Sequence, residues 1–138
     1  MRVIIDRRIL ASFRRRALAK YPVEYMEMVW GLSLPNRIEI NAFAELEHSA
    51  TPLQIDYDMA ELHNGAKEAE EVHLECLGSI HSHPQCESAE PSEADWIDGC
   101  KGKESIMGIL AIWKSKSGRF RSRLKWWRPE MPLKIEVR

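Results

Sequence analysis

Two histidines separated by one residue and followed at once by a proline are the feature that most constrains how this chain can fold. Side chains alternate across an extended backbone, so His81 and His83 are expected to project to the same side of one strand. Pro84 disfavours helical backbone at the preceding residue, which should keep His83 extended where the strand ends. The fold is therefore expected to present two ring nitrogens at one strand end.

A second polar motif follows after the eight residues 84–91. Ser92 is expected to cap a helix, and Asp95 should lie in its first turn with its carboxylate directed back toward the preceding loop. Two neutral imidazoles and one carboxylate are three protein ligands, which leaves a tetrahedral zinc ion one position for water. The two motifs together predict a catalytic zinc site formed by His81, His83 and Asp95.

A water molecule at such a metal needs a nearby base that takes its proton and passes it to the leaving amine. The carboxylates of Glu24, Glu27 and Glu75 are the candidates, and their positions in the sequence do not choose among them. Ser92 is expected to donate a hydrogen bond to the oxyanion that forms when water attacks a carbonyl. The residues alone thus predict a hydrolytic centre and leave its base open.

Hydrophobic periodicity predicts a mixed order of strands and helices. The expected strands cover residues 3–5, 25–34, 37–46, 72–78, 105–113, 120–127 and 133–137. The expected helices begin after caps at Asp6, Asp58 and Ser92. Such an order argues for one α/β (α+β) domain over residues 1–138, in which a curved mixed sheet is flanked by helices. The fourth expected strand carries the two histidines at its end.

The charge balance argues against a partner held by a global field, such as nucleic acid or anionic lipid, because 20 basic residues face 21 acidic ones. No segment approaches the roughly 20 apolar residues of a membrane span. The opening segment becomes charged within six residues, which does not suit a signal peptide. We therefore expect no nucleic-acid partner, no membrane and a cytoplasmic location.

The three cysteines, Cys76, Cys86 and Cys100, are an odd number without CxxC spacing, so neither a disulfide framework nor a cysteine-rich zinc site is expected. A reducing compartment is the simpler assumption. Cys76 is expected to be a small core residue. Cys86 lies between the two ligand motifs and is interpreted as a bystander, with contact between its thiolate and the metal as the alternative.

Three stretches of the chain resemble the JAMM (MPN-plus) metalloprotease family. Residues 78–84 are similar to the family's GxxHSHP strand end, and residues 91–95 are similar to its PSxxD helix start. Residues 22–24, with Gly31 seven residues after the glutamate, are similar to its PxExxGxLxG segment. The element order and the length are also similar to a minimal JAMM core, so the resemblance covers nearly the whole sequence.

By this resemblance, Glu24 rather than Glu27 is the general base, and Ser92 stabilises the tetrahedral intermediate. The two histidines and Asp95 then hold one Zn²⁺ per chain, within a cytidine-deaminase-like JAMM/MPN core. Two features depart from the family pattern. The loop 84–91 is one residue longer than usual and must bulge if Asp95 is to reach the metal. Glu27 stands where the family usually has glycine, so it either perturbs Glu24 or points to solvent.

The resemblance implies a zinc-dependent isopeptidase or peptidase that cuts after the C-terminal tail of ubiquitin or of a ubiquitin-like, sulfur-carrier-like modifier. That tail would lie extended along a strand edge beside the metal. One alternative is a zinc hydrolase for a small amide or a cell-wall peptide. Another is a non-catalytic MPN-type interaction module that binds a partner through Trp126 and the hairpin 119–128. Whether the protein acts alone or as a homodimer is left open.

Overall fold

The computed structural model describes residues 1–45, 48–50, 55–57, 59–93, 95, 105–129 and 131–138. Its elements in chain order are β1 (Arg2–Ile5), α1 (Arg7–Lys20), β2 (Met26–Leu34), β3 (Arg37–Glu45), β4 (His48–Ala50), β5 (Ile55–Tyr57), α2 (Met59–Glu71), β6 (Glu75–Pro84), β7 (Ile106–Lys114), β8 (Phe120–Arg128) and β9 (Met131–Val137). The mixed content of strands and helices predicted from the sequence is confirmed.

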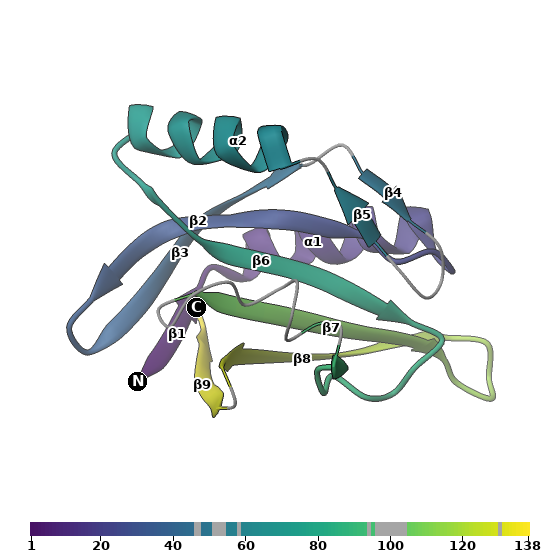
Figure 1. The fold of residues 1–138 in the computed structure, drawn as a ribbon. Coiled ribbons are helices and arrows are strands. Elements are labelled where there is room, and N and C mark those ends of the chain that lie inside the picture. The colour runs from purple at the N-terminus through teal and green to yellow at the C-terminus, as the bar shows by residue number, and fades with distance from the viewer. Residues whose placement is uncertain (46–47, 51–54, 58, 94, 96–104, 130) are drawn as a thin grey trace.

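The main sheet is mixed and runs in the order β1-β3-β2-β6-β7-β8-β9. β6 and β7 are parallel, as are the pairs that β1 makes with β3 and β9, and the other neighbours are antiparallel. Because β9 pairs with β1, the sheet curls until it closes (Figure 1). The expected curved mixed sheet is therefore present. A small antiparallel pair, β4 with β5, is an addition that the sequence pattern did not predict.

Helix α1 begins where the sequence predicts, because the Asp6 carboxylate accepts a hydrogen bond from the backbone N–H of Arg8 at 2.7 Å. One side of the helix is buried against the sheet, where the ring of Phe13 packs on Tyr25 with centroids 5.8 Å apart. The helix ends shortly before Pro22, which cannot continue it. These contacts fix α1 against one face of the sheet.

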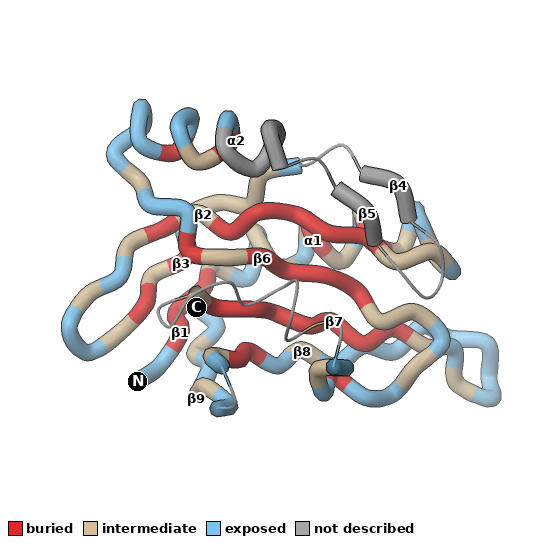
Figure 2. The backbone as a smooth tube through the Cα atoms, in the orientation of Figure 1, coloured by how far each residue is buried: buried red, intermediate tan, exposed pale blue. Residues whose placement is uncertain are grey.

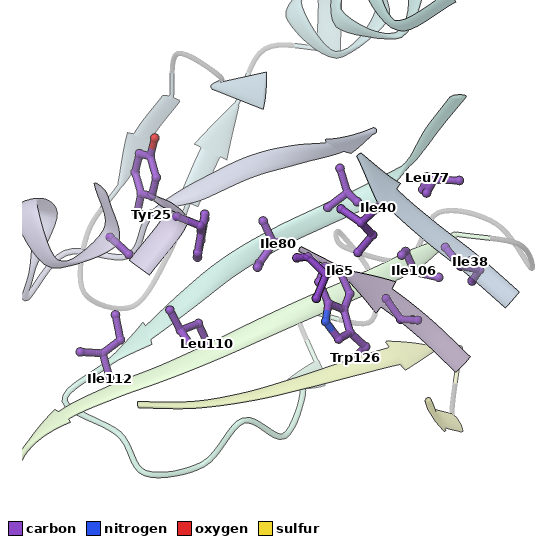
Figure 3. Packing of buried hydrophobic residues seen from close by; sticks show 14 residues of the cluster. Ile5, Tyr25, Ile38, Ile40, Leu77, Ile80, Ile106, Leu110, Ile112 and Trp126 are labelled. Atoms are coloured by element: carbon purple, nitrogen blue, oxygen red, sulfur yellow. The ribbon is translucent and has the colours of Figure 1, made fainter. Parts of the chain in front are cut away.

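The main core lies on the face of the sheet that α1 covers, and side chains from α1 and most of the strands meet there. Figure 3 labels Ile5, Tyr25, Ile38, Ile40, Leu77, Ile80, Ile106, Leu110, Ile112 and Trp126 in this cluster. β7 is buried along most of its length, and so is the middle of β6 (Figure 2). Strands covered on both faces have little freedom to move, so the end of β6 is a fixed frame for its side chains.

Alternation along β2 separates the two faces of the sheet. Tyr25 and Val29 belong to the main core beside α1, whereas Met26 and Met28 form a second cluster on the opposite face. Helix α2 packs on that opposite face, and Gly65 lets it approach because a Cβ there would overlap the side chain of Met28. In Figure 1, α2 accordingly lies above β2 and β6, with α1 behind the strands.

The strand expected over 72–78 begins at Glu75 instead, so this prediction was wrong for its first three residues. The backbone N–H groups of His73 and Leu74 donate to carbonyls in the last turns of α2 and cap its C-terminus. His73 has a φ of 61°, the left-handed conformation that such a cap requires. The apolar alternation of this stretch therefore reflects a helix cap and not a strand.

The expectation for Cys76 was also wrong, because Cys76 is exposed and is not a core residue. The adjacent Trp126 and Trp127 are only 0% and 8% exposed. The two rings lie on opposite faces of β8, since Trp126 packs into the main core and Trp127 packs against Ala89. Trp126 therefore offers no surface to a partner.

Some predicted features fall wholly or partly outside the described residues. They include the cap predicted at Asp58. The helix predicted from Ser92 is described only at Glu93 and Asp95, which are both helical. In the part of the chain that the structure describes, no helix is long and apolar enough to cross a membrane.

Replacing Gly78 by alanine tests the close approach of β6 and β7. Gly78 has a φ of 147°, and a Cβ at this position would overlap the carbonyl of Ile106. We expect Gly78→Ala to lower the free energy of unfolding by about 3 kcal/mol or more in urea denaturation. Gly118→Ala is the control, because its φ is 81° but its Cβ would meet no atom within 4 Å. Its cost should stay at about 1 kcal/mol, and an equal cost at both glycines would contradict this account.

Candidate metal centre

His81 and His83 lie on one side of β6, as their spacing predicts, and their Nε2 atoms are 3.1 Å apart. β6 is held on both edges, where His81 pairs with Met26 of β2 and with Ile109 of β7. Because Ile80 points into the main core, the histidines project from the opposite face of the sheet. Two ring nitrogens thus meet at a position that the sheet fixes.

Asp95 brings a carboxylate to the same point. Its oxygens lie 3.3 Å from His81 Nε2 and 3.0 Å from His83 Nε2. Ser92 sets the direction of this carboxylate, because its N–H donates to Asp95 Oδ2 at 2.8 Å while Asp95 N–H donates to the Ser92 hydroxyl at 3.1 Å. His81, His83 and Asp95 each offer one ligand atom, and these three atoms lie within 4.8 Å of one another.

The additional residue in the loop 84–91 does not keep Asp95 away from the histidines. The chain turns directly after β6, where Gln85 has a left-handed φ of 58°. Ala89 is then buried on the sheet against Met107 and Trp127. The loop therefore folds back over the sheet, and Asp95 reaches the two histidines as predicted.

The donor set fits a divalent metal ion. His83 Nδ1 lies 3.2 Å from the carbonyl oxygen of Ser88, and because a carbonyl only accepts, Nδ1 is the donor in this contact. When the ring is neutral, its lone pair then lies on Nε2, which faces His81 and Asp95. Two imidazole nitrogens and a carboxylate suit zinc, and iron or manganese also fit such a set.

The three ligand candidates are electrostatically coupled in the metal-free protein. Burial by itself would raise the pKa of Asp95, but hydrogen bonds from His81 and His83 outweigh it and hold that pKa far below its usual value. Burial opposes a charge on His83, yet its contacts with Asp95 prevail and raise the pKa of His83. A proton and a metal ion would compete for His83 Nε2, so metal binding should release protons.

Glu24 lies just before β2, close enough to the site that its carboxyl responds to the charges of His83 and Asp95. Burial raises the pKa of Glu24 to about 7, with His83 opposing this shift and Asp95 adding to it. A carboxyl with a pKa close to neutral pH can both take up and return a proton under working conditions. Glu24 is therefore a half-buried carboxyl within electrostatic reach of His83 and Asp95, with a pKa close to neutral pH.

Ser82, which the sequence pattern did not identify, ties the segment next to Glu24 to β6. Ser82 N–H donates to the carbonyl of Tyr25 at 2.9 Å, and Tyr25 N–H donates to the Ser82 hydroxyl at 2.9 Å. Ser82 is buried between the two histidines and faces away from them. A polar residue on the buried side of a strand was the available signal, because buried hydroxyls normally have a hydrogen-bond partner.

Glu27 fits neither of the two alternatives predicted for it. Its side chain is 0% exposed, so it does not point to solvent. It forms a bidentate ion pair with Arg16 of α1, with N–O distances of 2.5 and 2.8 Å, and it accepts from the Tyr25 hydroxyl at 2.6 Å. The pKa of Glu24 is shifted by burial and by the charges of His83 and Asp95, and Glu27 is not among these causes. The carboxylate of Glu27 is therefore a structural group on the α1 side of the sheet.

Glu75 and Cys86 lie outside the cluster of ligand atoms. Glu75 begins β6, six residues and therefore roughly 20 Å of extended chain before His81, where it accepts from Ser33 N–H at 2.9 Å. Cys86 Sγ accepts from Ser88 N–H at 3.3 Å, and the cluster of possible metal ligands among the described residues does not include it. The interpretation of Cys86 as a bystander agrees with this geometry.

The sequence matches a family model described as prokaryotic homologs of the JAB domain, over residues 6–124. No curated protein matches the chain. A protein from Desulfitobacterium hafniense has a similar solution structure, with a TM-score of 0.69 at 15% identity over 99% of this chain and 92% of that one. A JAB1/MPN domain protein from Archaeoglobus fulgidus gives a TM-score of 0.61 at 17% identity, over 99% and 97% of the two chains. At these identities the two structures show a common fold.

Replacing Glu24 by glutamine should stabilise the metal-free protein at alkaline pH. The unfolded chain loses the Glu24 proton near the ordinary pKa of 4.5, whereas the folded chain keeps it up to about pH 7. Between these values the unfolded state binds fewer protons, so the stability of the wild type falls as the pH rises. In urea denaturation of chelated protein, we expect Glu24→Gln to be more stable by about 1 to 2 kcal/mol at about pH 8, a figure discounted for partial exposure, and equal to the wild type near about pH 4.5.

Glu87→Gln is the matched control, because it changes an exposed carboxylate in the loop beside the site. It should alter stability by less than about 0.5 kcal/mol at both pH values. If Glu24→Gln gained the same stability at acidic as at alkaline pH, the ionisation of Glu24 would not be the cause.

Proposed function

Because the chain belongs to the family of prokaryotic homologues of the JAB domain, we propose that it is a zinc-dependent isopeptidase or peptidase. It would hydrolyse the bond after the C-terminal tail of ubiquitin or of a ubiquitin-like, sulfur-carrier-like modifier. The membership confirms the JAMM/MPN resemblance predicted from the motifs. The hydrolytic activity, the identity of the metal as zinc and the modifier as substrate are proposals that go beyond this family membership.

The observation that carries the proposal is the convergence of three ligand atoms beside a carboxyl of raised pKa. His81, His83 and Asp95 gather in the described part of the chain, and Glu24 lies within electrostatic reach of them. Structural zinc sites usually have four protein ligands, whereas three protein ligands leave a position for water or substrate. The geometry therefore supports a reactive metal centre more than a structural one.

The residues of the site divide the chemistry among them. A zinc ion held there would polarise the scissile carbonyl and lower the pKa of a neighbouring water. Glu24 would accept the proton of the attacking water and later return it to the leaving amine. Ser92 would donate to the developing oxyanion, because its hydroxyl oxygen accepts from Asp95 N–H and keeps its own proton for donation. Ser92 is also exposed, which leaves it open to a substrate.

The proposed partner is a modifier or its conjugate, met in the cytoplasm. A flexible tail suits a site at a strand end, because an extended peptide can pair with backbone groups beside it. An odd number of cysteines without CxxC spacing favours a reducing compartment. No part of this proposal requires nucleic acid or a membrane.

Zinc content tests the metal centre directly. Protein reconstituted with zinc and dialysed should hold about one ion per chain. His83→Ala and Asp95→Ala each remove a ligand and should retain less than about a tenth of that amount, whereas Glu24→Gln should retain all of it. Metal analysis of the four proteins measures this. A wild type that takes up no zinc after reconstitution would end the enzyme proposal.

Cleavage of a ubiquitin-like modifier fused through its tail to a reporter tests the reaction. Glu24→Gln should lower kcat/KM by about 100-fold or more while zinc stays bound, because the base is lost and the ligands are not. Glu87→Gln should leave cleavage unchanged. A small amide and a cell-wall peptide assayed alongside distinguish the substrate classes. Cleavage that survives in Glu24→Gln would show that Glu24 is not the base.

A further inference from the structure

Three consecutive carbonyl groups of the loop after β6 each accept a hydrogen bond from a side chain of the sheet. The Glu87 carbonyl accepts from Arg123 Nη1 at 3.2 Å, and the Ala89 carbonyl accepts from Trp127 Nε1 at 3.0 Å, with both donors on β8. The carbonyl between them, that of Ser88, accepts from His83 Nδ1 at 3.2 Å. The group that orients His83 is therefore held from both sides by β8.

Charge and ring contacts join the same loop to the same strand. Lys125 Nζ forms an ion pair with Glu90 Oε1 at 2.5 Å. Arg123 lies over the ring of Trp113, 5.7 Å from its centroid, which fixes the guanidinium on the sheet. Arg123, Lys125 and Trp127 alternate along β8, so all of them project from the face on which the histidines lie.

The hydrogen bonds to the carbonyls of Glu87 and Ala89 fix the direction of the Ser88 carbonyl, which side-chain packing alone would leave free to turn. A peptide plane can rotate about its flanking bonds while the neighbouring side chains stay in place. Here the carbonyls before and after Ser88 are each bound to a donor, so the plane between them has little freedom. A neutral imidazole carries one proton, and donation from Nδ1 leaves the lone pair of His83 on Nε2, where a metal would bind.

We propose that Trp127 and Arg123 are positioning residues of the metal centre. They hold the Ser88 carbonyl where it orients the ring of His83 and keeps the proton on Nδ1. This inference rests on the zinc site of the proposed function and is independent of the reaction and the substrate.

NMR of zinc-loaded, ¹⁵N-labelled protein tests the proposal without any substrate. In the wild type, the Nδ1–H of His83 should exchange slowly with water, because it donates to Ser88. Trp127→Phe keeps a ring in the cluster and removes the indole N–H. We expect this exchange to become about tenfold faster and the zinc affinity, measured by competition with a chelator, to fall about tenfold.

Arg123→Met gives a second variant that does not depend on the core, because Arg123 is exposed. It keeps an unbranched apolar side chain, removes the donors to the Glu87 carbonyl, and should shift both readouts in the same direction by about threefold or more. Arg121→Met is the matched control, an exposed arginine of the same strand that pairs with Trp113 of β7. Both readouts should stay within about twofold of the wild type in the control.

The outcomes separate this proposal from the one on which it rests. A loss of zinc affinity with unchanged exchange at His83 would mean that the two residues only stabilise the fold, and it would overturn the proposal. Values like those of the wild type in both variants would overturn it as well. A wild type that binds no zinc would overturn the metal centre itself. A wild type that binds zinc, beside two variants that behave like it, would overturn only the role of Trp127 and Arg123.

Discussion

A pair of reciprocal hydrogen bonds between Ser82 and Tyr25 is the interaction on which the geometry of the candidate site depends. Ser82 lies between the two histidines at the end of β6, and Tyr25 lies between Glu24 and the first residue of β2, 57 positions from Ser82 in the sequence. Both bonds involve backbone groups of Tyr25, so the position of Glu24 relative to the two histidines is set mostly by main-chain contacts. Main-chain contacts hold a distance more firmly than contacts through long side chains, which have several free torsions.

The ion pair between the partly exposed Arg16 and the buried Glu27 supports the same segment from the other face of the sheet. An unpaired carboxylate at a fully buried position would cost roughly 3 to 5 kcal/mol, so the pair fixes how α1 docks on β2. The Tyr25 hydroxyl donates to this carboxylate, and burial together with that bond raises the pKa of Tyr25, which keeps the hydroxyl a donor. Tyr25 is thus held by its backbone on β6 and by its ring on α1.

Local chemistry could be predicted from the sequence, whereas the partners of Glu27 and Trp127 on distant segments could not. The alternation that places His81 and His83 on one side, and the capping pattern that orients Asp95, depend on a few neighbouring residues, and both are present in the structure. Glu27 finds its partner only once α1 has docked. Trp127 is buried because the loop after β6 covers it, which no periodicity along β8 reveals. The left-handed turn at His73 was missed because strand alternation and a helix cap look alike over three residues.

The parallel pairing of β6 and β7 has a consequence for how such a centre can change. Antiparallel neighbours can be joined by a two-residue hairpin, but parallel ones need a long return path from one end of the sheet to the other. In this chain the return occupies residues 85–105, and it contains Ser92, Asp95 and the carbonyl of Ser88. The connection is obligatory for the topology, yet its length and composition are not dictated by the strand ladder. A centre of this kind therefore combines two ligands from a strand fixed within the sheet with a third from a connecting segment. The length and sequence of that segment can change while the pairing of the strands stays the same.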